Sequence, residues 1–102
     1  MLIFNTTFHI DDEIHDECLI FLREQYIAQA ATSGFLHQPR LALIHAQHEE
    51  HGTSYSLQFQ VKNIDTLNHW MQTQGAELQQ QLTQKFSTKV AGFVTLLEEI
   101  EL

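Results

Sequence analysis

The sequence predicts an α+β domain in which the elements follow the order β-α-β-β-α-β. Two segments carry apolar residues at helical spacing, the other four are rich in β-branched and aromatic residues, and polar or glycine-containing stretches separate them. At 102 residues, of which 43% are hydrophobic, the chain is long enough for one compact core and too short for two ordinary domains. We therefore expect a single domain over residues 1–102.

The first strand is expected over residues 2–9, where apolar and polar residues alternate imperfectly. A helix follows over residues 11–32, because Asp11 or Asp12 can cap its N-terminus, acidic residues suit the positive end of its dipole, and Gly34 ends it. We expect its apolar face to pack on the sheet. The residues of that face are Ile14, Cys18, Leu19, Phe21, Leu22, Tyr26 and Ala30.

The middle of the chain predicts a hairpin. After Pro39, residues 40–47 form the first expected strand, and residues 54–62 form the second. The polar stretch HEEHGT connects them and contains a glycine, as short hairpin connections usually do. The apolar side of the second strand consists of Tyr55, Leu57, Phe59 and Val61.

The last third predicts a second helix and a fourth strand. Asn63 is a plausible cap for a helix over residues 63–86, and residues 87–97 supply the strand. Gly75 falls on the apolar stripe of this helix, where glycine costs about 1 kcal/mol relative to alanine. We expect it to mark a break or a close approach to the sheet. The stripe consists of Ile64, Leu67, Met71, Leu78 and Leu82.

This order of elements is the ferredoxin-like arrangement, a four-stranded antiparallel sheet with both helices on one face. Such a sheet leaves its other face open to water, to a partner or to a ligand. The open face is expected to be polar but uncharged, and the last strand adds either Phe93, Thr95 and Leu97 or Val94 and Leu96. From the first and third strands it receives Asn5, Thr7, His9, Ser56, Gln58 and Gln60.

A neutral polar face is consistent with two sheets meeting face to face in a homodimer that encloses a cavity. The alternative is an ordinary solvated sheet with few charges. A small-molecule ligand in such a cavity is expected to contact Asn5, Thr7, Gln58, Gln60 or Tyr26.

The charge balance restricts the possible partners. Thirteen acidic residues against 5 basic ones give a formal net charge of -8, which disfavours nucleic acids and anionic membranes. The sequence shows neither the roughly 18 apolar residues of a membrane span nor the basic start of a secretory signal. Cys18 is the sole cysteine and has no internal disulfide partner, so we expect a cytoplasmic protein.

Three histidines near the hairpin turn raise the question of a metal site. His45 and His48 differ by three positions and would point to opposite faces of a strand, while His51 lies in the turn. Three ring nitrogens would have to converge within about 2.0–2.1 Å of a zinc ion. We therefore expect no metal and no cofactor.

His15 is the most interesting candidate for catalysis, and His9 is a second one. The helical wheel places His15 on the apolar face, where burial and the helix N-terminus would keep it neutral. It is then either a general base at the edge of a pocket or a core histidine bonded to a backbone carbonyl. Cys18 follows two acidic residues, whose negative charge disfavours a reactive thiolate, so we expect Cys18 to be a packing residue.

The stretches LIFNTTFHI, IHDECLIFL, GTSYSLQFQ and VAGFVTLLEEI together resemble the bacterial family known as domain of unknown function 4286. The resemblance covers nearly the whole chain and implies a ferredoxin-like fold related to the dimeric α+β barrels, which include small monooxygenases and haem-degrading enzymes. His15 and Ile27 match the family pattern. Cys18, Tyr26 and Ala28 depart from it, and Tyr26 replaces a second histidine.

Three functions are compatible with these observations, since glycine-rich phosphate loops, HExxH and nucleophile-elbow motifs are absent from the sequence. The first is a homodimeric domain with no established catalytic activity. The second is a dimeric-barrel enzyme, monooxygenase-like or haem-related, that acts on a small apolar molecule with His15 or His9 handling protons. The third is a regulatory module that binds a small molecule.

Overall fold

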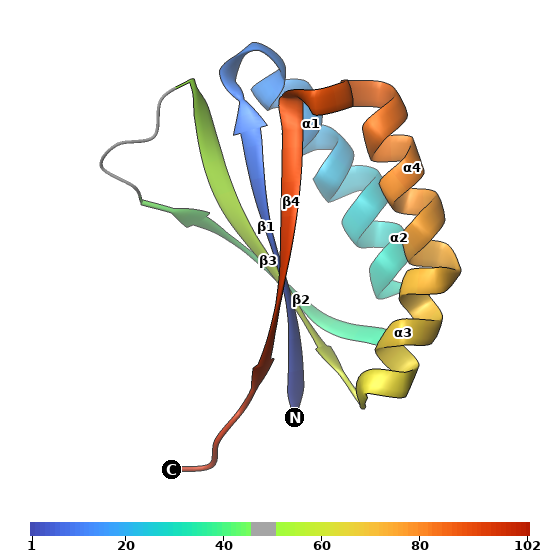
Figure 1. Ribbon diagram of the computed structural model, residues 1–102. Coiled ribbons are helices and arrows are strands. Elements are labelled where there is room, and N and C mark those ends of the chain that lie inside the picture. The colour runs from blue at the N-terminus through green and yellow to red at the C-terminus, as the bar shows by residue number, and fades with distance from the viewer. Residues whose placement is uncertain (46–50) are drawn as a thin grey trace.

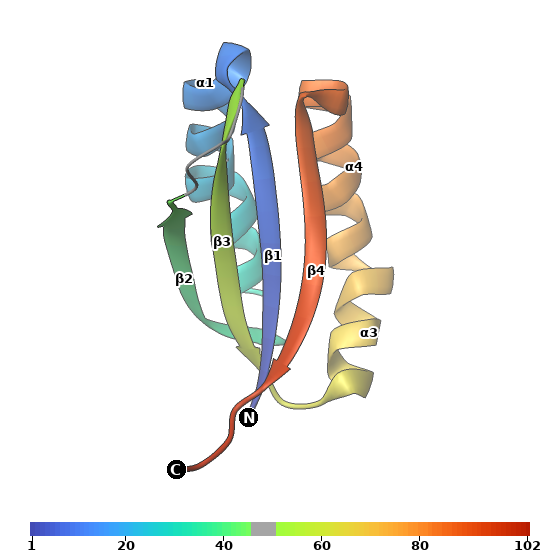
Figure 2. The same ribbon diagram turned by 60° about the vertical axis from the view of Figure 1, so that its left-hand side comes forward.

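The strands form one antiparallel sheet, and the helices cover one of its faces (Figure 1). This arrangement is seen in a computed structural model that describes residues 1–45 and 51–102. The sheet order is β2-β3-β1-β4, so the first strand lies in the interior (Figure 2). The predicted element order and ferredoxin-like arrangement are confirmed. The strands are β1 (Leu2–Asp11), β2 (Leu36–Ile44), β3 (Gly52–Val61) and β4 (Val90–Glu98).

The first helical segment begins where Asp11 caps a short 3-10 turn by accepting a hydrogen bond from the backbone N–H of Glu13 at 2.8 Å. It continues as α1 (His15–Phe21), a π-helical turn (Leu22–Tyr26) and α2 (Ile27–Ala31). A π turn contains an extra residue and rotates the residues that follow it. The expected apolar face is buried at Cys18, Phe21, Leu22, Tyr26 and Ala30.

The second helical segment is divided in two. Asn63 caps α3 (Ile64–Gln72) by accepting from the N–H of Thr66 at 2.8 Å, and α4 (Gln74–Phe86) begins after Thr73. A break near Gly75 is therefore confirmed. The close approach is to Trp70 and not to the sheet, because a Cβ at position 75 would lie 2.8 Å from the indole ring.

Part of the predicted stripe on this segment is wrong. Ile64 and Met71 are exposed, at 54% and 40%, whereas Trp70 is buried at 2%. Trp70 lies three positions after buried Leu67 and packs edge-on against Phe4 of β1, with ring centroids 5.8 Å apart. The large indole thus occupies the place that the sequence assigned to Met71.

The second strand also differs from its expected position, residues 40–47. Strand β2 begins at Leu36 and ends at Ile44, with an irregularity between His37 and Arg40. Proline has no N–H to donate and is tolerated in sheets at edges and bulges. Strand β2 is an edge strand, so the irregularity accommodates Pro39 within it.

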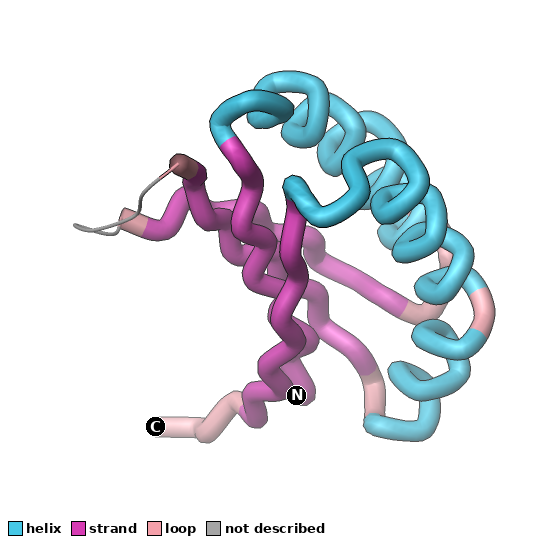
Figure 3. Tube along the Cα trace, turned by 45° about the horizontal axis from the view of Figure 1, so that its top comes forward, coloured by secondary structure: helices cyan, strands magenta, loops and turns pink. Residues whose placement is uncertain are grey.

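The two faces of the sheet differ in covering, as Figure 3 shows, with the helices on one side and the other side bare. The register pairs Thr7 with Phe93 and Asn5 with Thr95, which places Phe93, Thr95 and Leu97 on the open face. The core lies between sheet and helices. Within the described ranges, no helix has both the length and the apolar character needed to cross a membrane.

Candidate functional site

His15 is positioned at the end of the sheet where β1 finishes. The chain leaves β1 at Asp11 and turns sharply, and the N–H of Asp12 donates to the carbonyl of His51 at 3.0 Å. This bond ties the turn to the residue that precedes β3. As a result, the first residue of α1, His15, lies over the adjoining ends of β1 and β3.

Both ring nitrogens of His15 have partners. Nε2 lies 2.7 Å from the hydroxyl oxygen of Tyr55, and Nδ1 lies 2.8 Å from Oδ1 of Asp16. Tyr55 is paired with Phe8 in the sheet, so its side chain is on the face that the helices cover. The His15 side chain is 26% exposed, whereas that of Asp16 is 96% exposed. The helical wheel had placed His15 on the buried apolar face. In the structure His15 is half-buried and lies at the edge of the core.

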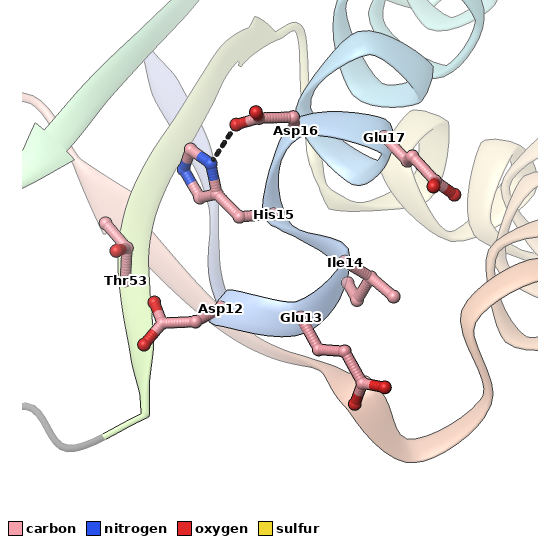
Figure 4. A pocket seen from close by; sticks show the side chains of 7 residues that line it. All are labelled: Asp12, Glu13, Ile14, His15, Asp16, Glu17 and Thr53. Atoms are coloured by element: carbon pink, nitrogen blue, oxygen red, sulfur yellow. Dashed lines mark hydrogen bonds and ion pairs between the residues drawn. The ribbon is translucent and has the colours of Figure 1, made fainter.

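A hollow of about 420 Å³ opens beside His15 (Figure 4). Asp12, Asp16 and Thr53 lie around the imidazole, while the carboxylates of Glu13 and Glu17 point away from it. Glu13 forms an ion pair with Lys89 at 2.8 Å. The carboxylates of Asp12 and Asp16 are thus the charges that face a molecule in this hollow.

The hydrogen bonds constrain where His15 carries its proton. A carboxylate can only accept, so the 2.8 Å bond to Asp16 requires a proton on Nδ1. Nε2 then accepts from the Tyr55 hydroxyl in the neutral ring or donates to its oxygen in the cationic ring. This order of hydroxyl, imidazole and carboxylate resembles the way in which enzymes orient a proton-transfer group.

His9, the other catalytic candidate, lies elsewhere. Its Nδ1 is 3.0 Å from the hydroxyl oxygen of Ser54 on the open face of the sheet. Gly52 makes room for its ring, because a Cβ there would collide with Nε2 of His9. His9 and His15 therefore do not form one site.

The predicted ligand contacts separate into two groups. On the open face, the hydroxyl of Ser56 donates to Asn5, and the amide of Asn5 donates to Thr7 at 3.2 Å. Gln58 lies beside Asn5 in the register, and Gln60 beside Ile3. These residues form one neutral polar surface on the bare side of the sheet.

Tyr26 belongs to the opposite side of the sheet. Its ring packs edge-on against Phe8 at a centroid distance of 5.6 Å, and burial raises the pKa of its hydroxyl to about 12. It lines a second cavity of about 260 Å³ between sheet and helices. The structure thus does not bring Tyr26 together with the other predicted ligand contacts.

The remaining candidates have simpler roles. His45 and His51 are exposed, and His48 lies outside the described residues. In the described ranges, His, Cys, Asp and Glu side chains form no group of three that could hold a metal ion. Cys18 is fully buried, and burial raises the pKa of its thiol to about 11, which suits packing against the core.

Tyr55 is the residue that the sequence did not single out. It is 40 positions from His15, and its place in an apolar alternation indicated only a core side chain. The helix-facing parity of Tyr55 was available from the sequence. Whether the Tyr55 hydroxyl reaches His15 depends on the length of the turn between the end of β1 and the start of α1.

Comparisons with known proteins agree with this fold. A solved structure described as "Crystal structure of antibiotic biosynthesis monooxygenase" matches with a TM-score of 0.72 and 16% sequence identity, covering 99% of this chain and 100% of the other. At that identity the likeness concerns the fold alone. No curated protein matches the sequence. The family model described as Domain of unknown function (DUF4286), a family with no assigned activity, matches residues 1–100. This match extends over nearly the whole chain, so the chain belongs to the DUF4286 family.

Proposed function

We propose that the protein is an enzyme in which His15 transfers a proton to and from a small polar molecule bound in the adjacent hollow. The observation that carries this proposal is the imidazole held between the Tyr55 hydroxyl and the Asp16 carboxylate, at the wall of a hollow of about 420 Å³. A ring fixed in this way presents a defined nitrogen to a ligand.

The working nitrogen is Nδ1. Its partner Asp16 is 96% exposed, so water or a ligand can displace that carboxylate at little cost. Once a bound molecule has displaced Asp16, the neutral ring can carry its proton on Nε2, which then donates to the Tyr55 hydroxyl oxygen. Nδ1 is then free to accept the proton that the molecule loses, which gives the imidazolium, and the return of a proton from Nδ1 restores the starting state. Tyr55 keeps the ring oriented throughout, because its hydroxyl contacts Nε2 from the other side.

The charges beside His15 indicate which molecules would bind. Asp12 and Asp16 face the hollow, and the formal net charge of the whole chain is -8. Anionic groups in a cleft attract cations and repel anions. We therefore expect a small molecule with an amine or another positive group, which is more polar than the apolar substrate expected from the fold.

Proton transfer can be measured before the net reaction is known. In D₂O, α-amino esters and aminoketones exchange the C–H next to the carbonyl, and ¹H NMR follows the loss of that signal. We expect the wild-type protein to accelerate exchange of at least one such compound. Since positioned acids and bases typically contribute about 100- to 10,000-fold, His15→Asn should lower the enzymatic rate by about 100-fold or more.

His9→Asn provides the matched control, because it removes an imidazole bonded to Ser54 on the other face. Its exchange rate should equal that of the wild type, while Tyr55→Phe should reduce the rate by loosening the His15 ring. Equal rates in wild type and His15→Asn would contradict the proposal. So would a complete absence of protein-dependent exchange across the compounds.

We further propose that two chains associate through their open sheet faces. The centre of this face is neutral, and Asn5, although on the bare side, is only 8% exposed and bonded to Ser56 and Thr7. Beside it, Phe93 and Leu97 are 63% and 42% exposed. Polar groups that satisfy one another, flanked by exposed apolar side chains, suit a surface that a second copy covers.

Introducing charge at this face should separate the chains. Gln58→Glu with Gln60→Glu would place four carboxylates close together in the dimer, and like charges across an interface cost several kcal/mol. We expect light scattering to report monomers at concentrations where the wild type is dimeric. Gln80→Glu with Gln84→Glu adds the same charge on exposed positions of α4 and should leave the dimer intact. Dimers that survive the first pair of substitutions would exclude this interface.

We place this dimer in the cytoplasm. Cys18, the sole cysteine, is fully buried and has no disulfide partner within its own chain. Proteins that dispense with disulfides are typical of reducing compartments.

A further inference from the structure

A cavity of about 260 Å³ between the sheet and the helices lies apart from the His15 hollow. Four residues of its floor are at most 7% exposed, and two residues of its rim are at least 40% exposed. This gradient describes a depression that reaches from the surface into the core. The floor includes Phe4, Thr6, Tyr26 and Trp70, and the rim includes Met71 and Val94.

Gly92 is the first indication that the cavity is kept open, because a larger side chain at this position would occupy part of it. It lies within β4, opposite Phe8, and it is not among the residues with positive φ. A Cβ at this position would meet Phe8 at 3.5 Å and Thr6 at 3.6 Å, which is ordinary van der Waals contact. Neither backbone conformation nor crowding therefore requires glycine. A glycine inside a strand weakens the strand and often marks a bulge, a bend, or the close approach of a ligand or another backbone.

The helical side of the cavity is irregular as well. Tyr26 is the last residue of the π turn Leu22–Tyr26, and such turns are frequent at functional sites. Across from it, α4 begins after Thr73 without a side-chain cap, and its early residues Gly75 and Ala76 line the cavity. The first N–H groups of a helix lack intrahelical partners. Two departures from regular helix therefore border the same space.

The polar groups around the cavity are suited to a hydrogen-bond acceptor. Trp70 belongs to the cavity wall, and its indole N–H, which can only donate, is buried and has no partner among the described residues. A ligand oxygen would reach this N–H only after a small shift of the ring. Tyr26 and Thr6 add hydroxyl groups, and Gln79 adds an amide. The described residues that line the cavity carry no charged side chain. An ionic ligand would lose its hydration there without gaining a counter-charge.

We propose that this cavity binds a small, uncharged, mainly apolar molecule that carries one hydrogen-bond acceptor such as a carbonyl oxygen. A cavity of about 150 Å³ can hold benzene, so this larger one has room for a single substituted ring. The aromatic side chains of Phe4, Tyr26 and Trp70 supply the apolar walls.

Three probes of similar size test the proposal by ¹⁹F NMR. 4-Fluoroacetophenone is neutral and has a carbonyl acceptor, fluorobenzene lacks the acceptor, and 4-fluorobenzoate carries a charge. We expect 4-fluoroacetophenone to bind with a Kd below about 1 mM, a range open to a ligand of this size. Fluorobenzene should bind more weakly, and 4-fluorobenzoate should not bind measurably. Trp70 is the only tryptophan, so its fluorescence gives an independent report from the cavity wall.

Filling the cavity is the decisive variant. Gly92→Val should weaken binding of 4-fluoroacetophenone at least tenfold without lowering the melting temperature. The smaller Gly92→Ala, whose Cβ meets no clash, should weaken it by a lesser but measurable factor. Ala91→Val, one residue earlier and on the other face of the same strand, should leave the Kd unchanged.

Other results would overturn the proposal. One is that the wild-type protein binds none of the probes. A second is that 4-fluorobenzoate binds as strongly as 4-fluoroacetophenone. A third is that the Kd of 4-fluoroacetophenone is unchanged in Gly92→Ala. If Gly92→Val does not fold, Gly92→Ala alone decides the matter. None of these results depends on His15, so they are independent of the exchange experiment.

Discussion

Replacing Phe8 by alanine is expected to lower the free energy of unfolding by about 3–5 kcal/mol. Phe8 has no exposed surface, lies in the interior strand β1 and packs edge-on against Tyr26. Truncation removes its apolar contacts and leaves a void that the flanking strands cannot easily close. A domain of this size has only about 5–15 kcal/mol of total stability, so the midpoint of urea unfolding should fall steeply.

Ile20→Ala is the control for this prediction. Ile20 is 56% exposed on the outer side of α1, and alanine is at least as good a helix former. Its unfolding free energy should change by no more than about 0.5 kcal/mol. If Phe8→Ala lowered the free energy of unfolding no more than Ile20→Ala does, Phe8 would not be packed between β1 and the helices as described.

Alkaline pH is expected to destabilise the protein by several kcal/mol between about pH 9 and pH 12. Burial raises the pKa of Cys18 from 9.0 to about 11 and that of Tyr26 from 10.0 to about 12. In this window the unfolded chain has released protons that the folded chain still holds. Stability is therefore unaffected by these groups below about pH 9 and declines as the pH rises through the folded pKa values.

Each of these shifts corresponds to about 2–3 kcal/mol, since one pKa unit is worth about 1.4 kcal/mol. Urea unfolding between pH 8 and pH 12 measures the decline. Cys18→Ala and Tyr26→Phe should each remove the part of the pH dependence that its titrating group causes. Because each variant has its own unfolding free energy at pH 8, the change from that value is what is compared. The hydrogen bond to Glu13 raises the pKa of Lys89 as well, but Lys89 is present in every one of these proteins and does not affect their comparison. A double variant with the same pH slope as the wild type would contradict this assignment.

The helix starts show how much local sequence determines. Asp11 and Asn63 were predicted as caps, and each accepts a backbone hydrogen bond at 2.8 Å. An N-cap needs only a short polar side chain and the N–H groups that follow it, so the signal is complete within four residues. The alternation in β1 and β3 was equally informative, because successive side chains on a strand point to opposite faces.

The wrong predictions involve contacts that no local pattern contains. Pro39 was taken to precede a strand, but the sheet edge accommodates it within β2. Trp70 replaces Met71 in the core because the helix breaks at Thr73 and the indole packs against Phe4 and Gly75. The parity of β4 was open until its pairing with β1 placed Phe93 on the bare face.

The sequence by itself determined the order of the elements and the apolar face of most of them, since the periods of strand and helix are local properties of the chain. Only the tertiary structure decided which polar groups meet. His15 contacts a tyrosine 40 positions away, and Gly92 opens a cavity whose opposite wall contains Tyr26. Such distances depend on strand register and on how each helix sits over the sheet, and those are set by the packing of the whole core.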